Sequence, residues 1–287
     1  MFATLLGPLP RPPLPDDADP LEVLDAVLAA QSEAGLDPLT TAGWDLDPSD
    51  PVGSWRAAAD RTDRLVKAVV TGPLSGDRDA AAVRDTLVTL RDAGCAWIEV
   101  HEPAATTIDD DAGRRRFADA HRTLTADLEG VHLSLAITGG NADALGVDAI
   151  AASPYASLAV DLIDGPENWR LVAAWPGERG VIAGAMTTRP GRGDGPEVLL
   201  YAAGYAASTK GRGGDRVGLA TAGSLAHLPW DSAVRRMGRL GDAARLATDS
   251  PDAIRAAVDP RALDARSAAM GRYAPPKGRP SRSRDST

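Results

Sequence analysis

The chain alternates short apolar runs with longer Ala-rich amphipathic stretches along most of its length. Short runs rich in Val, Ile and Leu are typical of buried parallel strands, whereas apolar residues three and four positions apart are typical of helices. The stretch 78–94 has the helical pattern, because Val83, Leu87 and Leu90 share one helical face and Gly94 follows them. Repeated strand–helix pairs predict an α/β protein with a parallel sheet.

Eight strands and eight helices are predicted within residues 1–273, as a single (β/α)8 TIM barrel requires. A doubly wound sheet is the alternative, but no G-x-G-x-x-G motif follows the first predicted strand. The first helix is predicted over about residues 20–34, with Asp19 as its N-cap and Gly35 after its last turn. The predicted strands are 2–7, 37–44, 66–73, 95–100, 131–137, 157–163, 180–186 and 216–223. The polar, basic tail 274–287 is predicted to be disordered.

The composition limits the kinds of partner. The 287 residues carry a formal net charge of -9 at pH 7, whereas a nucleic-acid partner requires a basic surface. We therefore expect a small-molecule substrate and no nucleic-acid partner. Residues 1–17 have no basic segment and are broken by prolines, which predicts neither a signal peptide nor a membrane span. We accordingly expect a cytoplasmic protein without a membrane partner, and the sequence leaves its oligomeric state open.

The segment 95–104, CAWIEVHEPA, holds the densest group of reactive side chains. In a barrel, chemistry belongs at the carboxyl ends of the strands, and this segment covers the end of the fourth predicted strand. Strand alternation places Glu99 and His101 on the face opposite Ile98 and Val100, so both are expected to point inward. Inward Glu and His side chains suit general acid–base catalysis, and a structural ion pair is the equally open alternative. Cys95, the only cysteine, is expected to be a small core residue.

Four segments resemble the catalytic barrel of the cobalamin-independent methionine synthase family. They are AAQSEAGLDPLT (29–40), VKAVVTGPLS (66–75), AGCAWIEVHEPA (93–104) and VGLATAGSL (217–225). The third segment is the most specific, because it matches the family's G-x-x-x-I-Q-I-D-E-P-A at Gly94, Ile98 and Glu102 and at the Pro-Ala that follows. The resemblance extends over nearly the whole chain and implies the same barrel fold. It also places this chain among the uroporphyrinogen decarboxylase/methionine synthase-like barrels.

The resemblance implies methyl transfer from a methyl-folate or related donor to a thiol such as homocysteine, assisted by a zinc ion that activates the thiol. The family's zinc ligands are a His and a Cys after the fifth strand, a Glu after the sixth and a Cys after the eighth. These positions fall here on Ser134 and Ala136, near Asp161, and on Gly223. Zinc is expected for the family, but its ligands are not retained in this sequence, so we predict no metal site. A methyl-folate donor remains possible.

The predicted catalytic residues are Glu102, His101 and Glu99, which could transfer protons and orient a ligand. The predicted substrate-binding residues are Asp161, Ser134, Trp44 and Gly7, each at or near the end of a predicted strand. Trp44 is also expected to contribute to packing. Two functions remain open from the sequence. One is a diverged, zinc-free methyltransferase of the methionine synthase type, and the other is a non-catalytic barrel that binds a ligand or a partner.

Overall fold

The structure, a computed structural model, describes residues 1–47, 49–190, 196–250 and 253–254. Its centre is one curled sheet of seven parallel strands in the order β1-β7-β6-β5-β4-β3-β2, so β1 and β2 form its two edges. The strands are β1 (Phe2–Thr4), β2 (Ala68–Thr71), β3 (Trp97–His101), β4 (His132–Ile137), β5 (Ser157–Asp161), β6 (Gly180–Met186) and β7 (Val217–Thr221). The parallel α/β architecture predicted from the alternation is confirmed with seven of the eight strands.

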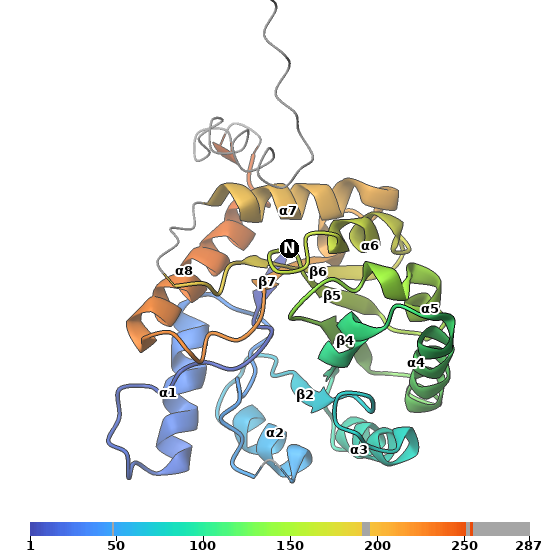
Figure 1. Ribbon diagram of the computed structural model, residues 1–287. Helices are drawn as coiled ribbons and strands as arrows, with labels where there is room; N and C mark the ends of the chain where they lie inside the picture. The colour runs from blue at the N-terminus through green and yellow to red at the C-terminus, as the bar shows by residue number, and fades with distance from the viewer. Residues whose placement is uncertain (48, 191–195, 251–252, 255–287) are drawn as a thin grey trace, which may run out of the picture.

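Helices surround this sheet and follow one another in chain order (Figure 1). Helix α8 packs against both α7 and α1, so the outer layer continues across the edges of the sheet. Among the described residues, no helix has the length and apolar character needed to cross a membrane. The helices are α1 (Pro20–Glu33), α2 (Pro51–Ala59), α3 (Ala80–Asp92), α4 (Asp111–Leu124), α5 (Val147–Ala151), α6 (Asn168–Ala174), α7 (Pro196–Ser208) and α8 (Trp230–Leu246).

The first helix begins and ends as the sequence predicts. The side chain of Asp19 accepts a hydrogen bond from the backbone N–H of Leu21, and Gly35 adopts a left-handed φ of +75° beyond the last turn. The predicted disordered tail, 274–287, lies outside the described residues.

The predicted second strand, 37–44, does not form, and isolated bridges join this segment to Ala3 in β1 and to Val66, two residues before β2. The side chain of Gln31 binds both the N–H and the carbonyl oxygen of Thr40, which removes that residue from strand pairing. Ala42 and Gly43 then take left-handed φ values of 52° and 83°, which end the extended backbone. The sheet is therefore open between β1 and β2, and the closed eight-stranded barrel remains an expectation.

The inside of the curled sheet is packed mainly with small and apolar side chains. Leu6, Trp97 and Ile182 form a buried cluster there with Ala136, Ala159 and Ala220. A larger apolar core lies between the strands and the helices. Several polar side chains share this face, among them Glu99, His101 and Ser134, and they mark the candidate site.

Candidate functional site

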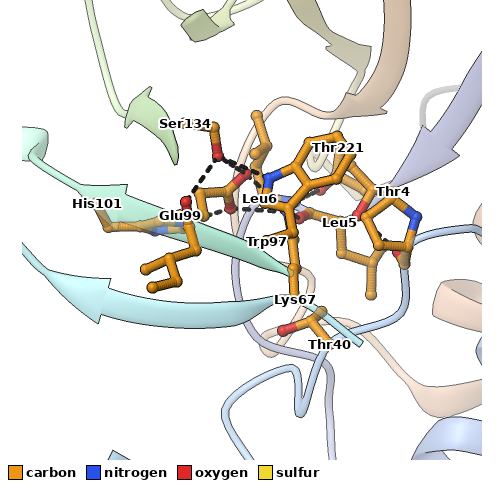
Figure 2. A network of polar contacts seen from close by, with 12 residues as sticks. Thr4, Leu5, Leu6, Thr40, Lys67, Trp97, Glu99, His101, Ser134 and Thr221 are labelled. Carbon is orange, nitrogen blue, oxygen red and sulfur yellow. Dashed lines mark hydrogen bonds and ion pairs between the residues drawn. The ribbon is translucent and has the colours of Figure 1, made fainter. Parts of the chain in front are cut away.

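A buried chain of polar contacts crosses the inside of the sheet from β2 to β3. The ammonium group of Lys67 donates to both carboxylate oxygens of Glu99, each at 2.8 Å. The Glu99 Oε1 atom lies 2.7 Å from Nε2 of His101, two residues further along β3 (Figure 2). Lys67 and Glu99 have fully buried side chains, whereas that of His101 is 18% exposed. Of these three side chains, His101 is the one that solvent can reach.

Two further contacts support Glu99 and Lys67. The hydroxyl of Ser134 on β4 accepts the indole N–H of Trp97 at 3.0 Å and lies 3.5 Å from Glu99 Oε2. Lys67 also donates to the carbonyl oxygen of Leu5 at 2.9 Å, and this bond links the residue before β2 to the residue after β1, where the sheet is open (Figure 2). The structure therefore brings together three predicted site residues, Glu99, His101 and Ser134, around a lysine.

Glu99 is ionised at neutral pH. Burial acts to raise its pKa, but the Lys67 charge and the hydrogen bond with His101 outweigh burial and lower that pKa to about 2. Burial lowers the pKa of Lys67, and the carboxylate of Glu99 opposes that shift. Because the ammonium group lies among three oxygens, we treat Lys67 and Glu99 as an ionised pair.

This electrostatic arrangement selects one form of the His101 ring. An ionised carboxylate can only accept hydrogen bonds, so the Nε2 atom of His101 must carry the hydrogen in its contact with Glu99. In the neutral ring, Nδ1 then has a free lone pair. Within the described part of the chain, no side chain or backbone group is hydrogen-bonded to Nδ1. This geometry is the one that a general base oriented by a carboxylate requires, and the catalytic role of His101 stays a prediction.

Glu102 lies on the other side of β3, away from this chain of contacts. Its buried carboxylate accepts hydrogen bonds from the backbone N–H groups of Leu74 and Ser75 and from the Ser75 hydroxyl. His121 Nε2 on α4 lies 3.3 Å from Glu102 Oε2, and its Nδ1 lies 2.6 Å from the hydroxyl of Tyr155. Burial acts to raise the pKa of Glu102, but the hydrogen bonds from His121 and Ser75 outweigh burial and lower it. Glu102 thus fixes the loop that follows β2.

Gly72 makes room for this carboxylate. A Cβ atom on Gly72 would lie 2.2 Å from Glu102 Oε2, so Gly72→Ala must displace the carboxylate or the loop. We expect the substitution to lower the free energy of unfolding by about 1–3 kcal/mol, the usual range for overpacking, as measured by urea denaturation. Gly204→Ala in α7 is the matched control, because a Cβ there meets nothing within 4 Å. A Gly72→Ala protein as stable as the control would contradict the role given to Gly72.

Asp161, at the end of β5, is occupied by its own loop. Its carboxylate accepts from the backbone N–H groups of Ile163 at 2.8 Å, Asp164 at 2.9 Å and Gly139 at 3.3 Å. Burial raises its pKa above the usual value, although these hydrogen bonds oppose that shift. The geometry therefore assigns Asp161 to loop organisation, and its predicted role in substrate binding stays a prediction.

The contacts of Gly7 and Trp44 are with the loops after β7 and β1, and not with Glu99 or His101. Gly7 has a φ of +122°, and a Cβ atom on it would lie 2.9 Å from the backbone nitrogen of Ser224. Trp44 donates its indole N–H to the carbonyl oxygen of Leu9 at 3.2 Å. Both residues hold the loop after β1 in place, and their predicted contact with substrate stays a prediction.

A cavity of about 450 Å³ borders the open edge of β2. Thr71, which lines it, is the register partner of His101 on β3, so the cavity lies one strand away from the imidazole. Val69, 38% exposed, points into the same region from β2. The cavity is lined by Thr41, Asp45, Trp55, Val69, Thr71 and Arg78, among others. Helices α2 and α3 also contribute to the lining through Trp55 and Thr86, and the cavity follows the edge of β2 without including His101 in its lining.

The sequence analysis did not single out Lys67. A signal was present, because Lys67 is the one charged residue within the strand-like run 66–71. A lysine in a buried strand needs a carboxylate partner, and Glu99 was already expected on the inward face. Cys95 is 2% exposed within the core, and burial raises the pKa of its thiol, which confirms the prediction of a core residue.

Comparison with known proteins shows sequence similarity to methionine-forming methyltransferases over part of the chain. No protein-family model matches it. Two curated proteins from Rhodopseudomonas palustris, strains TIE-1 and ATCC BAA-98 / CGA009, are each 32% identical to it over 152 residues. Both are named 5-methyltetrahydropteroyltriglutamate–homocysteine methyltransferase. The resemblance to the cobalamin-independent methionine synthases is confirmed. The matched region covers 51% of this chain but only 18% of each relative.

Solved structures agree on the fold. A B12-independent methionine synthase from Shewanella sp. W3-18-1, in complex with selenomethionine, superposes with a TM-score of 0.72 at 14% identity. The match covers 85% of this chain and 96% of that one. A putative vitamin-B12 independent methionine synthase from Listeria monocytogenes gives a TM-score of 0.63 at 11% identity, covering 84% and 97%. At these identities the likeness establishes the fold alone.

The residues at the positions of the family's zinc ligands do not fit a zinc ion. Ala136 and Gly223 have no side-chain donor atom, and the hydroxyl of Ser134 accepts the indole N–H of Trp97. The carboxylate of Asp161 is taken up by backbone N–H groups. Within the described ranges, no group of three or more His, Cys, Asp or Glu side chains could hold a metal ion.

Proposed function

We propose that the protein is a methyltransferase-like barrel that activates a small thiol with His101 in place of a zinc ion. The observation that carries this proposal is the contact between Nε2 of His101 and the ionised carboxylate of Glu99, which leaves Nδ1 free to accept a proton. The similarity to methionine synthases supports methyl transfer as the reaction class, with homocysteine as the thiol to test first. The cavity beside Thr71, at about 450 Å³, has the size of a small-molecule site and lies one strand away from this base.

The proposed reaction is balanced in protons and electrons. Nδ1 of His101 takes the proton of the thiol, and the resulting thiolate attacks the methyl carbon of a methyl-folate or related donor. The sulfur–carbon bond forms as the nitrogen–carbon bond of the donor breaks, and the donor nitrogen keeps that electron pair. The imidazolium returns its proton to the donor nitrogen, while Glu99 stabilises the positive ring.

A non-catalytic, ligand-binding barrel is the second candidate. It is favoured by the small, uncharged residues Ala136 and Gly223 at strand ends where the related enzymes are expected to have metal ligands. A protein of this kind would bind a thiol or a folate without converting it. The two candidates therefore differ in turnover and not in binding.

Turnover measured with and without a chelator tests the proposal. We expect the purified protein to contain less than one zinc per chain by elemental analysis. We also expect slow transfer from methyl-folate to homocysteine that a chelator leaves unchanged, because proton removal by an imidazole activates a thiol less than zinc does. Binding without any turnover would favour the second candidate. One tight zinc per chain, with activity lost on chelation, would contradict the proposed role of His101.

A further inference from the structure

Lys67 cannot act on a substrate directly. Its side chain is fully buried, and its ammonium group is 2.8 Å from both oxygens of Glu99 and 2.9 Å from the carbonyl oxygen of Leu5. An ammonium group has three hydrogens to donate, so these three oxygens use its whole capacity. Any effect of Lys67 on the site must therefore pass through Glu99.

The charges around Glu99 decide where protons reside. The titratable groups that act on it are Lys67, His101 and His132, and burial lowers the pKa of His132 to about 4, so His132 is neutral at neutral pH. A buried group of charges is most stable when its net charge is zero. Lys67 and Glu99 meet this balance between them, so loss of the Lys67 charge favours a protonated Glu99.

We propose that Lys67 is a positioning residue: its ammonium group keeps Glu99 an ionised acceptor, so that Nε2 of His101 carries the ring hydrogen and Nδ1 is left as the basic nitrogen. This inference rests on the proposed role of His101 as a base. It assigns to Lys67 the task of making Nδ1 available.

Removal of the Lys67 charge leaves Glu99 without the ammonium group that holds it ionised. The buried carboxyl group then takes up a proton and donates it to Nε2 of His101, so the ring hydrogen moves to Nδ1. Nδ1 is then lost as the base.

Diethyl pyrocarbonate, which acylates unprotonated imidazole nitrogens, measures this directly without any substrate. Peptide mapping follows the rate at His101 at pH 7, and the exposed His227 serves as an internal reference. We expect Lys67→Gln and Lys67→Met to slow modification of His101 on the order of tenfold, because Nδ1 carries the ring hydrogen in these variants and Nε2 accepts a hydrogen bond. Lys67→Arg, which keeps the charge, should react close to the rate of the unmodified protein.

Arg212→Met is the matched control for lost stability. Arg212 is 1% exposed, and its guanidinium binds the carbonyl oxygens of Trp175, Ala206 and Arg179 in another part of the fold. Arg212→Met should leave the rate of diethyl pyrocarbonate modification at His101 unchanged. Unchanged His101 reactivity in Lys67→Gln would overturn the inference.

If the Lys67 variants do not fold, the test is ¹⁵N NMR of the Lys67 side chain in the unmodified protein. A neutral Lys67 amine at pH 7 would overturn the inference. The inference and the proposed function can fail separately. A reactive His101 that depends on Lys67, in a protein without methyl transfer, would remove the function and leave the inference standing.

Discussion

Glu99→Gln is expected to lower the free energy of unfolding by about 3–5 kcal/mol at pH 7, the cost of leaving one partner of a buried ion pair uncompensated. Lys67 would keep its charge inside the sheet, with only the amide oxygen of the new side chain and the carbonyl of Leu5 as acceptors. Urea denaturation monitored by tryptophan fluorescence measures the loss. Asp127→Asn is the matched control, because Asp127 pairs with Arg84 at the surface, and its loss should cost at most about 1 kcal/mol.

The same variant gives a pH test with a definite sign. The pKa of Glu99 falls from its ordinary value of 4.5 to about 2 on folding, so its contribution to stability is fully present above 4.5. That contribution is lost as the pH falls from 4.5 toward 2. The difference in stability between the unmodified protein and Glu99→Gln should shrink over this window. A difference that stays constant through it would mean that Glu99 is not ionised in the folded protein.

His101→Asn is expected to reduce methyl transfer by about 10²–10⁴-fold, the usual contribution of a general base. The effect should fall on kcat, because the imidazole acts on the thiol proton as the sulfur–carbon bond forms. Stability should change little, since the His101 side chain is partly exposed and Glu99 keeps its contacts with Lys67 and Ser134. Initial rates at saturating methyl-folate and homocysteine provide the measurement.

His227→Asn provides the control for that comparison. His227 is exposed, and its ring contacts only the carbonyl oxygen of Thr188 among the described residues. It should keep the full rate of the unmodified protein. Equal rates for His101→Asn and the unmodified protein would show that the base lies elsewhere.

Much of the fold followed from local patterns, because a buried parallel strand and an amphipathic helix each leave a periodic signature. The predicted second strand does not form, because the side chain of Gln31 hydrogen-bonds both backbone groups of Thr40, nine positions later. Strand alternation also placed Glu99 and His101 correctly on the inner face. Their roles depended on Lys67, which lies 32 positions before Glu99, and no short-range pattern reports such a pairing.

The fold brings only some of the predicted site residues together. Glu102 shares the side of β3 taken by Val100, so the same alternation rule separates it from Glu99 and His101. Asp161 occupies a strand end, as expected, but the turn after β5 uses its carboxylate for backbone N–H groups. Such occupation depends on the loop's conformation, which the sequence pattern does not specify. We therefore propose positioning roles for Glu102 and Asp161.

The protonation state of the His101 ring tests the central claim most directly. ¹⁵N NMR of histidine-labelled protein separates a protonated ring nitrogen from an unprotonated one, and the signals can be assigned with His101→Asn. At pH 7 and above, we predict that Nε2 of His101 carries the hydrogen and Nδ1 carries none, because Glu99 is an ionised acceptor. A hydrogen on Nδ1, with Nε2 unprotonated, would contradict the assignment of His101 as the base of this site.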